Sequence, residues 1–209
     1  MEKKATTRQE GGVAKEREGA SPPRPFAPSP RRVLLLGLGN PYLTDDGVGV
    51  RVAMGVKARL EESQPILASR SNAGTLPHSL IGYAQSPADL TITECSVGGL
   101  TLMENMVGYD RVILVDAIQT QNSPPGAIHR LTLDDLRAIS PTQHAASPHD
   151  ASLITALEAG KHLGMTLPEE VVIYAVEVEN TLDFSEQPTP AVAEAIPQVI
   201  ALVLDEICQ

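Results

Sequence analysis

The chain has 209 residues, 42% of them hydrophobic, which fits one folded domain with a sizeable core. No apolar run approaches the roughly 18 residues that span a bilayer, and the N-terminal segment lacks the apolar stretch of a secretory signal. We therefore expect a cytoplasmic protein without a membrane partner. Two cysteines, Cys95 and Cys208, are too few for a disulfide framework, which agrees with a reducing compartment.

Charge divides the chain into two unequal parts. Residues 1–32 hold eight of the 16 Lys and Arg and four of the 26 Asp and Glu, so this segment carries +4 and the remainder carries −14. Residues 1–31 are also rich in Pro, Gly and Ser, which predicts a disordered basic tail. Residues 32–209 form the predicted single domain, and its acidic surface makes nucleic acid a poor partner.

Five stretches rich in Val, Ile and Leu are predicted strands: 33–38, 89–94, 111–117, 127–133 and 171–178. The first, third and last are almost continuously apolar, which is typical of strands buried on both faces of a largely parallel sheet. The fourth follows a Pro-Pro-Gly segment and alternates in polarity. We therefore expect it to be an edge strand, which can run antiparallel.

Four helices are expected from apolar periodicity. The first, 47–62, carries valines four residues apart. A shorter one follows Gly98-Gly99, with Leu100, Met103 and Val107 as its apolar stripe. The third starts at "SPHD" (147–150), which has a capping residue and a proline at the first helical position. The last starts at Thr189-Pro190, and Pro197 inside it predicts a kink.

This alternation of elements predicts a three-layer α/β/α sandwich around a mostly parallel, mixed five-stranded sheet. Such folds place their sites beyond the carboxyl ends of the strands. Residues 63–88 show weak periodicity and exceed the usual connection in a compact domain. We expect this segment to be a long loop or an insertion.

Asp45 and Asp46 follow the first strand and open the first helix. Unpaired backbone N–H groups and the helix dipole favour an ionised carboxylate at that position. Thr44 or Asp45 can cap the helix, which leaves Asp46 available for either a structural or a functional role.

Asp116 ends a buried apolar strand, where an unpaired carboxylate carries a large desolvation penalty. Hydrogen bonds from neighbouring backbone N–H groups or a functional partner can each compensate it.

His149 lies four residues before Leu153 and extends the inward stripe of its helix, whose dipole favours the neutral imidazole. If Asp46, Asp116 and His149 converge, their O, O and N donors suit a divalent metal such as Zn or Ni.

Three segments, "LGLGNPYLTDDGVGVRV", "YDRVILVDAI" and "SPHDASLITAL", resemble the signature segments of the hydrogenase maturation proteases. These endopeptidases trim the C-terminal tail of [NiFe]-hydrogenase large subunits. The similarity covers most of 32–209 in matching order. The basic tail, the long 63–88 connection and "ECSVGG" in place of an acidic, glycine and threonine run depart from the family pattern.

The resemblance implies a site with catalytic and metal-contacting residues Asp46, Asp116 and His149 and with substrate-binding residues Asn40, Gly98 and Gly99. It also implies that the metal is nickel supplied by the substrate, and that the partner is a hydrogenase large-subunit precursor. A carboxylate can then activate water beside the nickel, or the metal can polarise the scissile carbonyl. We expect the protein to act as a monomer.

Other functions use parts of the same pattern. A non-enzymatic nickel-binding chaperone or docking factor can use the same ligands, because the sequence shows neither a Ser/His/Asp order nor His-Glu-x-x-His. "GLGNP" (37–41) also occurs near the start of peptidyl-tRNA hydrolases. The residues that follow it here differ from those of that family, and the domain is acidic where those enzymes are usually basic. A dinucleotide-binding site is also a poor match, because this segment lacks the third glycine of the dinucleotide-binding motif. No spacing argues for ligation by the remaining histidines, His78, His129, His144 and His162.

Overall fold

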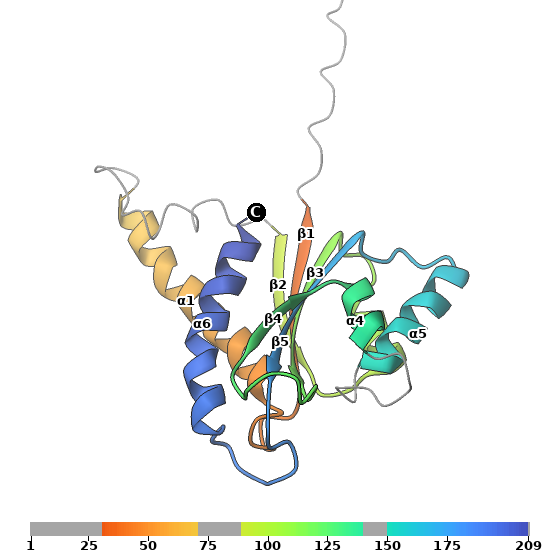
Figure 1. The fold of residues 1–209 in the computed structure, drawn as a ribbon. Helices are drawn as coiled ribbons and strands as arrows, with labels where there is room; N and C mark the ends of the chain where they lie inside the picture. The colour runs from red at the N-terminus through yellow and green to blue at the C-terminus, as the bar shows by residue number, and fades with distance from the viewer. Residues whose placement is uncertain (1–30, 71–88, 140–149, 209) are drawn as a thin grey trace, which may run out of the picture.

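The computed structural model describes residues 31–70, 89–139 and 150–208, which form one sheet with helices on both faces (Figure 1). The strands are β1 (Arg32–Leu38), β2 (Asp89–Cys95), β3 (Arg111–Ile118), β4 (Ile128–Leu131) and β5 (Glu170–Glu177). Their order is β2-β1-β3-β5-β4. All pairs are parallel except β4 with β5, so the predicted mixed sheet with an antiparallel edge strand is confirmed.

The helices are α1 (Val48–Arg70), α3 (Gly99–Met106), α4 (Leu133–Ile139), α5 (Asp150–His162) and α6 (Pro190–Ile207). Residues of α1 and α6 pack on one face of the sheet, and residues of α3, α4 and α5 pack on the other. Figure 1 shows α1 and α6 on one side of the strands and α4 and α5 on the opposite side. The predicted three-layer architecture is therefore confirmed.

Three helix predictions need correction. α1 continues to Arg70 and does not end at residue 62, so the first part of the expected 63–88 loop is helical; residues 71–88 lie outside the described residues. Leu100 is exposed and does not join the apolar stripe of α3. The sequence analysis also missed α4, although a local signal marks its start. Thr132 and Asp135 exchange hydrogen bonds in a capping box, and those bonds lower the pKa of Asp135.

A buried polar network joins α6 to the sheet. The Glu206 carboxylate, 1% exposed, accepts hydrogen bonds from Arg111, from Arg130 at 2.9 and 3.0 Å, and from the Tyr174 hydroxyl at 2.7 Å. The bond from Arg130 is the main reason that the pKa of Glu206 falls to about 2. Burial, together with the bond to Glu206, raises the pKa of Tyr174 to about 12. Each buried charge thus has partners, as burial requires.

Among the described residues, no helix combines the length and the apolar character needed to cross a bilayer. Neither Cys95 nor Cys208 takes part in a disulfide.

Candidate active site

The turn between β1 and α1 folds Asp46 back over the end of β1. Asp46 is partly buried, and its Oδ2 accepts the backbone N–H of Asn40 at 2.7 Å. Gly39 has φ +114°, and a Cβ at this position would lie 1.8 Å from the carbonyl oxygen of Asp46. Only glycine allows this approach, so the carboxylate position depends on the absence of a side chain at residue 39.

Asp45 has a structural role, although it is the neighbour of Asp46. Its side chain is fully buried, and Oδ1 accepts the backbone N–H of Thr189 at 2.7 Å. Its Oδ2 accepts the Thr189 hydroxyl at 3.1 Å and the backbone N–H of Asn180 at 3.2 Å. The Thr44 hydroxyl donates to the carbonyl of Asp183. The expectation that Thr44 or Asp45 caps α1 is therefore wrong, because both side chains bind the segment before α6.

Asp116 lies inside β3, two residues before its end at Ile118, and does not terminate the strand as the sequence suggested. It is 3% exposed, and its Oδ1 accepts the backbone N–H of Ala117 at 2.8 Å. Val112, Leu114 and Ile118 of the same strand pack with α3 and α5. Strand alternation therefore directs Asp116 to the face of the sheet that α3 and α5 cover.

Strand register brings Asp46 and Asp116 to one edge of the sheet. β1 and β3 are parallel neighbours with Gly37 beside Val115, so both strands end at the same side. α1 sits directly on these ends, because a Cβ at Gly49 would lie 2.2 Å from the Val115 carbonyl oxygen. Two carboxylates thus lie at the carboxyl ends of adjacent parallel strands, where this fold class carries its sites.

His149 lies outside the described residues. α5 begins one residue later, at Asp150, and packs through Leu153 and Ala156 on the face of the sheet to which Asp116 points. The part of the chain that the structure describes contains no cluster of at least three His, Cys, Asp or Glu side chains able to hold a metal. The convergence of Asp46, Asp116 and His149 therefore stays a prediction.

The three predicted substrate-binding residues lie at the same edge. Asn40 closes the β1–α1 turn, since its Oδ1 accepts the backbone N–H of Tyr42 at 3.0 Å. Gly98 is the N-cap of α3, and Gly99 has φ +63°. The β2–α3 loop is joined to the β1–α1 turn because the backbone N–H of Gly39 donates to the carbonyl of Cys95 at 3.2 Å.

The sequence analysis missed a second polar group near this edge. Glu177, at the end of β5, is 2% exposed and accepts the backbone N–H groups of Thr120 and Gln121. His129 Nε2 lies 3.8 Å from Glu177 Oε2. The register places His129 beside Ala175, which pairs with Asp116 on its other side, so His129 and Asp116 share one row across the sheet. Spacing along the chain could not reveal this row, because it depends on the strand order.

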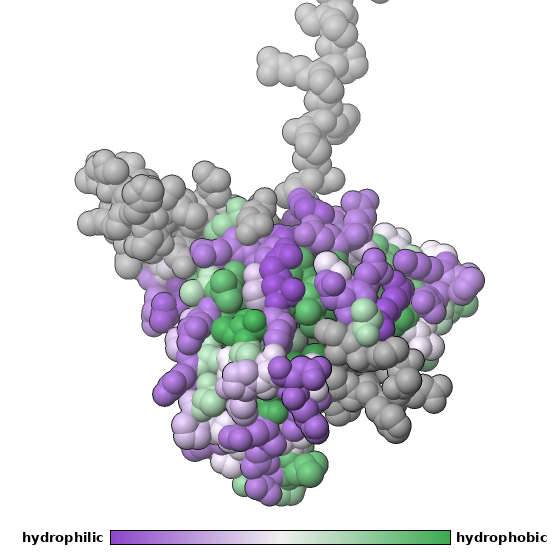
Figure 2. Space-filling model, in the orientation of Figure 1, coloured by the Kyte–Doolittle hydropathy of each residue, from purple (hydrophilic) through white to green (hydrophobic). Residues whose placement is uncertain are grey.

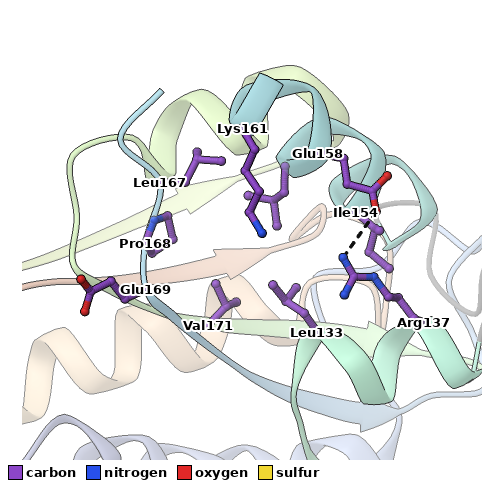
Figure 3. Close-up of a pocket in the computed structure, with 10 residues that line it drawn as sticks. Leu133, Arg137, Ile154, Glu158, Lys161, Leu167, Pro168, Glu169 and Val171 are labelled. Atoms are coloured by element: carbon purple, nitrogen blue, oxygen red, sulfur yellow. Dashed lines mark hydrogen bonds and ion pairs between the residues drawn. The ribbon is translucent and has the colours of Figure 1, made fainter. Parts of the chain in front are cut away.

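Two cavities accompany these elements. A cleft of about 310 Å³ opens beside Glu177 and is lined by Gln119, Gln121, Ser123, Pro125, Val178 and Glu179. A smaller cavity of about 100 Å³ lies between α4, α5 and the start of β5, at the opposite end of the sheet. Figure 3 shows its apolar floor, including Leu133 and Val171, and the ion pair between Arg137 and Glu158 at its rim. Of these two cavities, which the described residues line, the larger one adjoins the strand ends that carry the carboxylates.

The chain is similar to known proteins in sequence and in fold. A family model described as hydrogenase maturation protease (HycI) matches residues 76–206. The hydrogenase 2 maturation protease of Escherichia coli (strain K12) is 25% identical over 173 residues, which are 83% of this chain and 88% of that protein. The hydrogenase maturating endopeptidase HybD from E. coli has a similar structure, with a TM-score of 0.62 and 25% identity over 84% of this chain and 91% of that one. The HycI [NiFe] hydrogenase maturation protease from Thermococcus kodakarensis shares the fold, with a TM-score of 0.52 and 22% identity over 87% and 94% of the two chains.

Proposed function

The chain belongs to the hydrogenase maturation protease family, and on that premise we propose that it removes the C-terminal tail of a [NiFe]-hydrogenase large-subunit precursor. The cut follows nickel insertion, and the protein acts in the cytoplasm as a monomer. Support comes from the relatives, which are hydrogenase maturation endopeptidases. The observation that carries the proposal is the pair of carboxylates, Asp46 and Asp116, at the carboxyl ends of β1 and β3.

The proposed chemistry divides the roles of these carboxylates. Asp46 is the more exposed of the two and sits on a turn, so it is the better placed to meet the substrate. Asp116 is buried and held by the backbone, which fixes its position. Together with His149 they offer O, O and N donors, a set that suits nickel carried by the substrate.

Hydrolysis of the peptide bond requires a water molecule to attack the carbonyl and a proton to reach the departing amine. In the proposed site a carboxylate accepts the proton of the attacking water and then gives it to the departing amine nitrogen. The substrate's nickel contributes as a Lewis acid at the same place. Because the substrate's metal completes the site, the protease does not cleave a precursor without nickel.

The test is the intact mass of a large-subunit precursor after incubation with the protein. We predict that the nickel-loaded precursor is shortened by its C-terminal tail, while the nickel-free precursor in a parallel sample keeps its full mass. A nickel chaperone or docking factor also binds the precursor but leaves both masses unchanged. Unchanged mass of a loaded precursor in the presence of bound protein therefore contradicts the protease and supports the chaperone.

A further inference from the structure

Exposed apolar side chains gather on the loops that surround the candidate site. Among the described residues, Leu182 is 84% exposed, Phe184 is 88% exposed and Tyr42 is 59% exposed. Single exposed apolar residues are normal on a protein surface, but a group beside a functional site marks an interaction surface. Figure 2 shows hydrophobic atoms at the lower end of the molecule, where Figure 1 places the β5–α6 loop.

Backbone hydrogen bonds join the two loops that carry these residues. The N–H of Ser185 donates to the carbonyl of Tyr42 at 3.0 Å, and the N–H of Thr44 donates to the carbonyl of Ser185 at 2.9 Å. The β5–α6 loop therefore lies against the β1–α1 turn that carries Asp46. We name the three side chains Tyr42, Leu182 and Phe184 the apolar platform.

The loop that presents Leu182 and Phe184 is held in one shape. Asn180 Oδ1 accepts the N–H groups of Leu182 at 3.3 Å and Asp183 at 3.2 Å, and its Nδ2 donates to Asp183 Oδ2 at 2.9 Å. A preorganised loop loses little entropy on binding, so exposed apolar groups on it are suited to recognition. Aromatic side chains such as Phe184 often dominate the binding energy of protein interfaces.

Charge and position indicate the kind of partner. Glu179, Asp183 and Glu186 are exposed in the same loop, so the platform is apolar with an acidic rim. A second copy of this acidic chain would be repelled by that rim. The basic N-terminal segment joins the sheet at the start of β1, the end opposite to the platform, where Arg31 pairs with Glu170 at 3.1 Å.

We propose that the apolar platform docks the folded body of the hydrogenase large-subunit precursor, through an apolar patch with a basic rim on that partner. This inference rests on the proposed function and adds the surface by which the substrate is held. Because Tyr42 and Asp46 belong to the same turn, a partner on the platform lies next to the candidate site. The flexible tail of the precursor can then reach that site while its body stays docked.

The test compares binding and processing by the wild type and the double variant Leu182→Ser/Phe184→Ser. We expect the double variant to bind the nickel-loaded precursor at least about tenfold more weakly, because it loses its central apolar contacts. Its KM for processing should rise by a similar factor while kcat at saturating precursor stays near the wild-type value. The control is Leu163→Ser, which removes a side chain that is also largely exposed, at 73%, but lies at the C-terminal end of α5. This control should match the wild type.

Three outcomes overturn the docking proposal. They are equal affinity of the double variant and the wild type, no binding by the wild type, and a dimer of the protein alone that the double variant abolishes. The last outcome, measured by light scattering, would identify the platform as a self-association surface. Failure of the proposed function is a separate result: the wild type then binds the loaded precursor, the double variant does not, and no precursor is shortened.

Discussion

Asp45 and Asp46 are adjacent in the chain, but their carboxylates lie in different surroundings. The partners of Asp45 are Asn180 and Thr189, which lie 135 and 144 residues further along the chain. Such distant partners leave no trace in the local pattern, so the sequence offered Thr44 or Asp45 as the cap of the first helix, which the structure does not support. The sequence could still predict that Asp46 differs in role from its neighbour, because one capping residue is enough at the turn before the helix. This residue therefore remains the candidate for function.

We predict that Asp45→Asn and Asp46→Asn separate stability from activity. Asp45→Asn places an amide N–H group among N–H and O–H donors and should lower the free energy of unfolding by about 1–3 kcal/mol. Asp46→Asn should leave unfolding nearly unchanged and slow processing of the loaded precursor by about 100-fold or more. Urea unfolding and a processing assay on both variants check this. Normal processing by a folded Asp46→Asn protein contradicts the assigned role.

At the scale of helices and strands, hydrophobic patterns predicted most of the fold. Nearly continuous apolar runs identified β1, β3 and β5, because these strands are buried on both faces. The β4 segment alternated in polarity, as an edge strand does. The pattern failed for α4, because a helix of 7 residues is too short to show a helical repeat of apolar residues. It also failed for the end of α1, which continues to Arg70 although the apolar residues there show only weak periodicity.

The contact between α1 and the strand ends gives the prediction at this scale. A Cβ at Gly49 would collide with backbone oxygens of Val115 and Leu38, whereas a Cβ at Gly55 would meet only the movable end of the Ile200 side chain. Gly49→Ala should therefore lower the free energy of unfolding by about 1–3 kcal/mol. Gly55→Ala, in the same helix, should be neutral or stabilising by up to about 1 kcal/mol. Equal stability of both variants in urea unfolding contradicts the close packing.

For the whole molecule, the order of the strands in the sheet determines which residues meet at the candidate site. The sequence does not reveal that order. β1 and β3 are neighbours although α1, β2 and α3 lie between them in the chain. This order brings Asp46 and Asp116 to one edge, and it also puts His129 in the row of Asp116. The sequence pattern could predict that each carboxylate lies near the carboxyl end of a strand, although Asp116 is two residues before the end of β3. It could not show which ends are adjacent.

Attachment of the outer layer α6 to the sheet depends on pH through Glu206. The pKa of Glu206 is about 2 in the folded protein against an ordinary 4.5, so the unfolded chain binds its proton first as the pH falls. The contribution of Glu206 is therefore full above pH 4.5 and is lost as the pH falls towards 2, by at most about 3 kcal/mol. The wild type should lose stability more steeply over this window than Glu206→Gln. Glu194→Gln, an exposed site on the same helix, should follow the wild type, and parallel curves for all three proteins contradict the linkage.

The most direct test of the account is the intact mass of a nickel-loaded large-subunit precursor after incubation with wild type or with Asp116→Asn. Asp116 is the buried carboxylate of the candidate site, and the amide has the same shape without the charge. We predict that the wild type removes the C-terminal tail and that a folded Asp116→Asn protein leaves the full-length mass. Equal shortening by both proteins would contradict a cleavage site built on the carboxylates at the ends of β1 and β3.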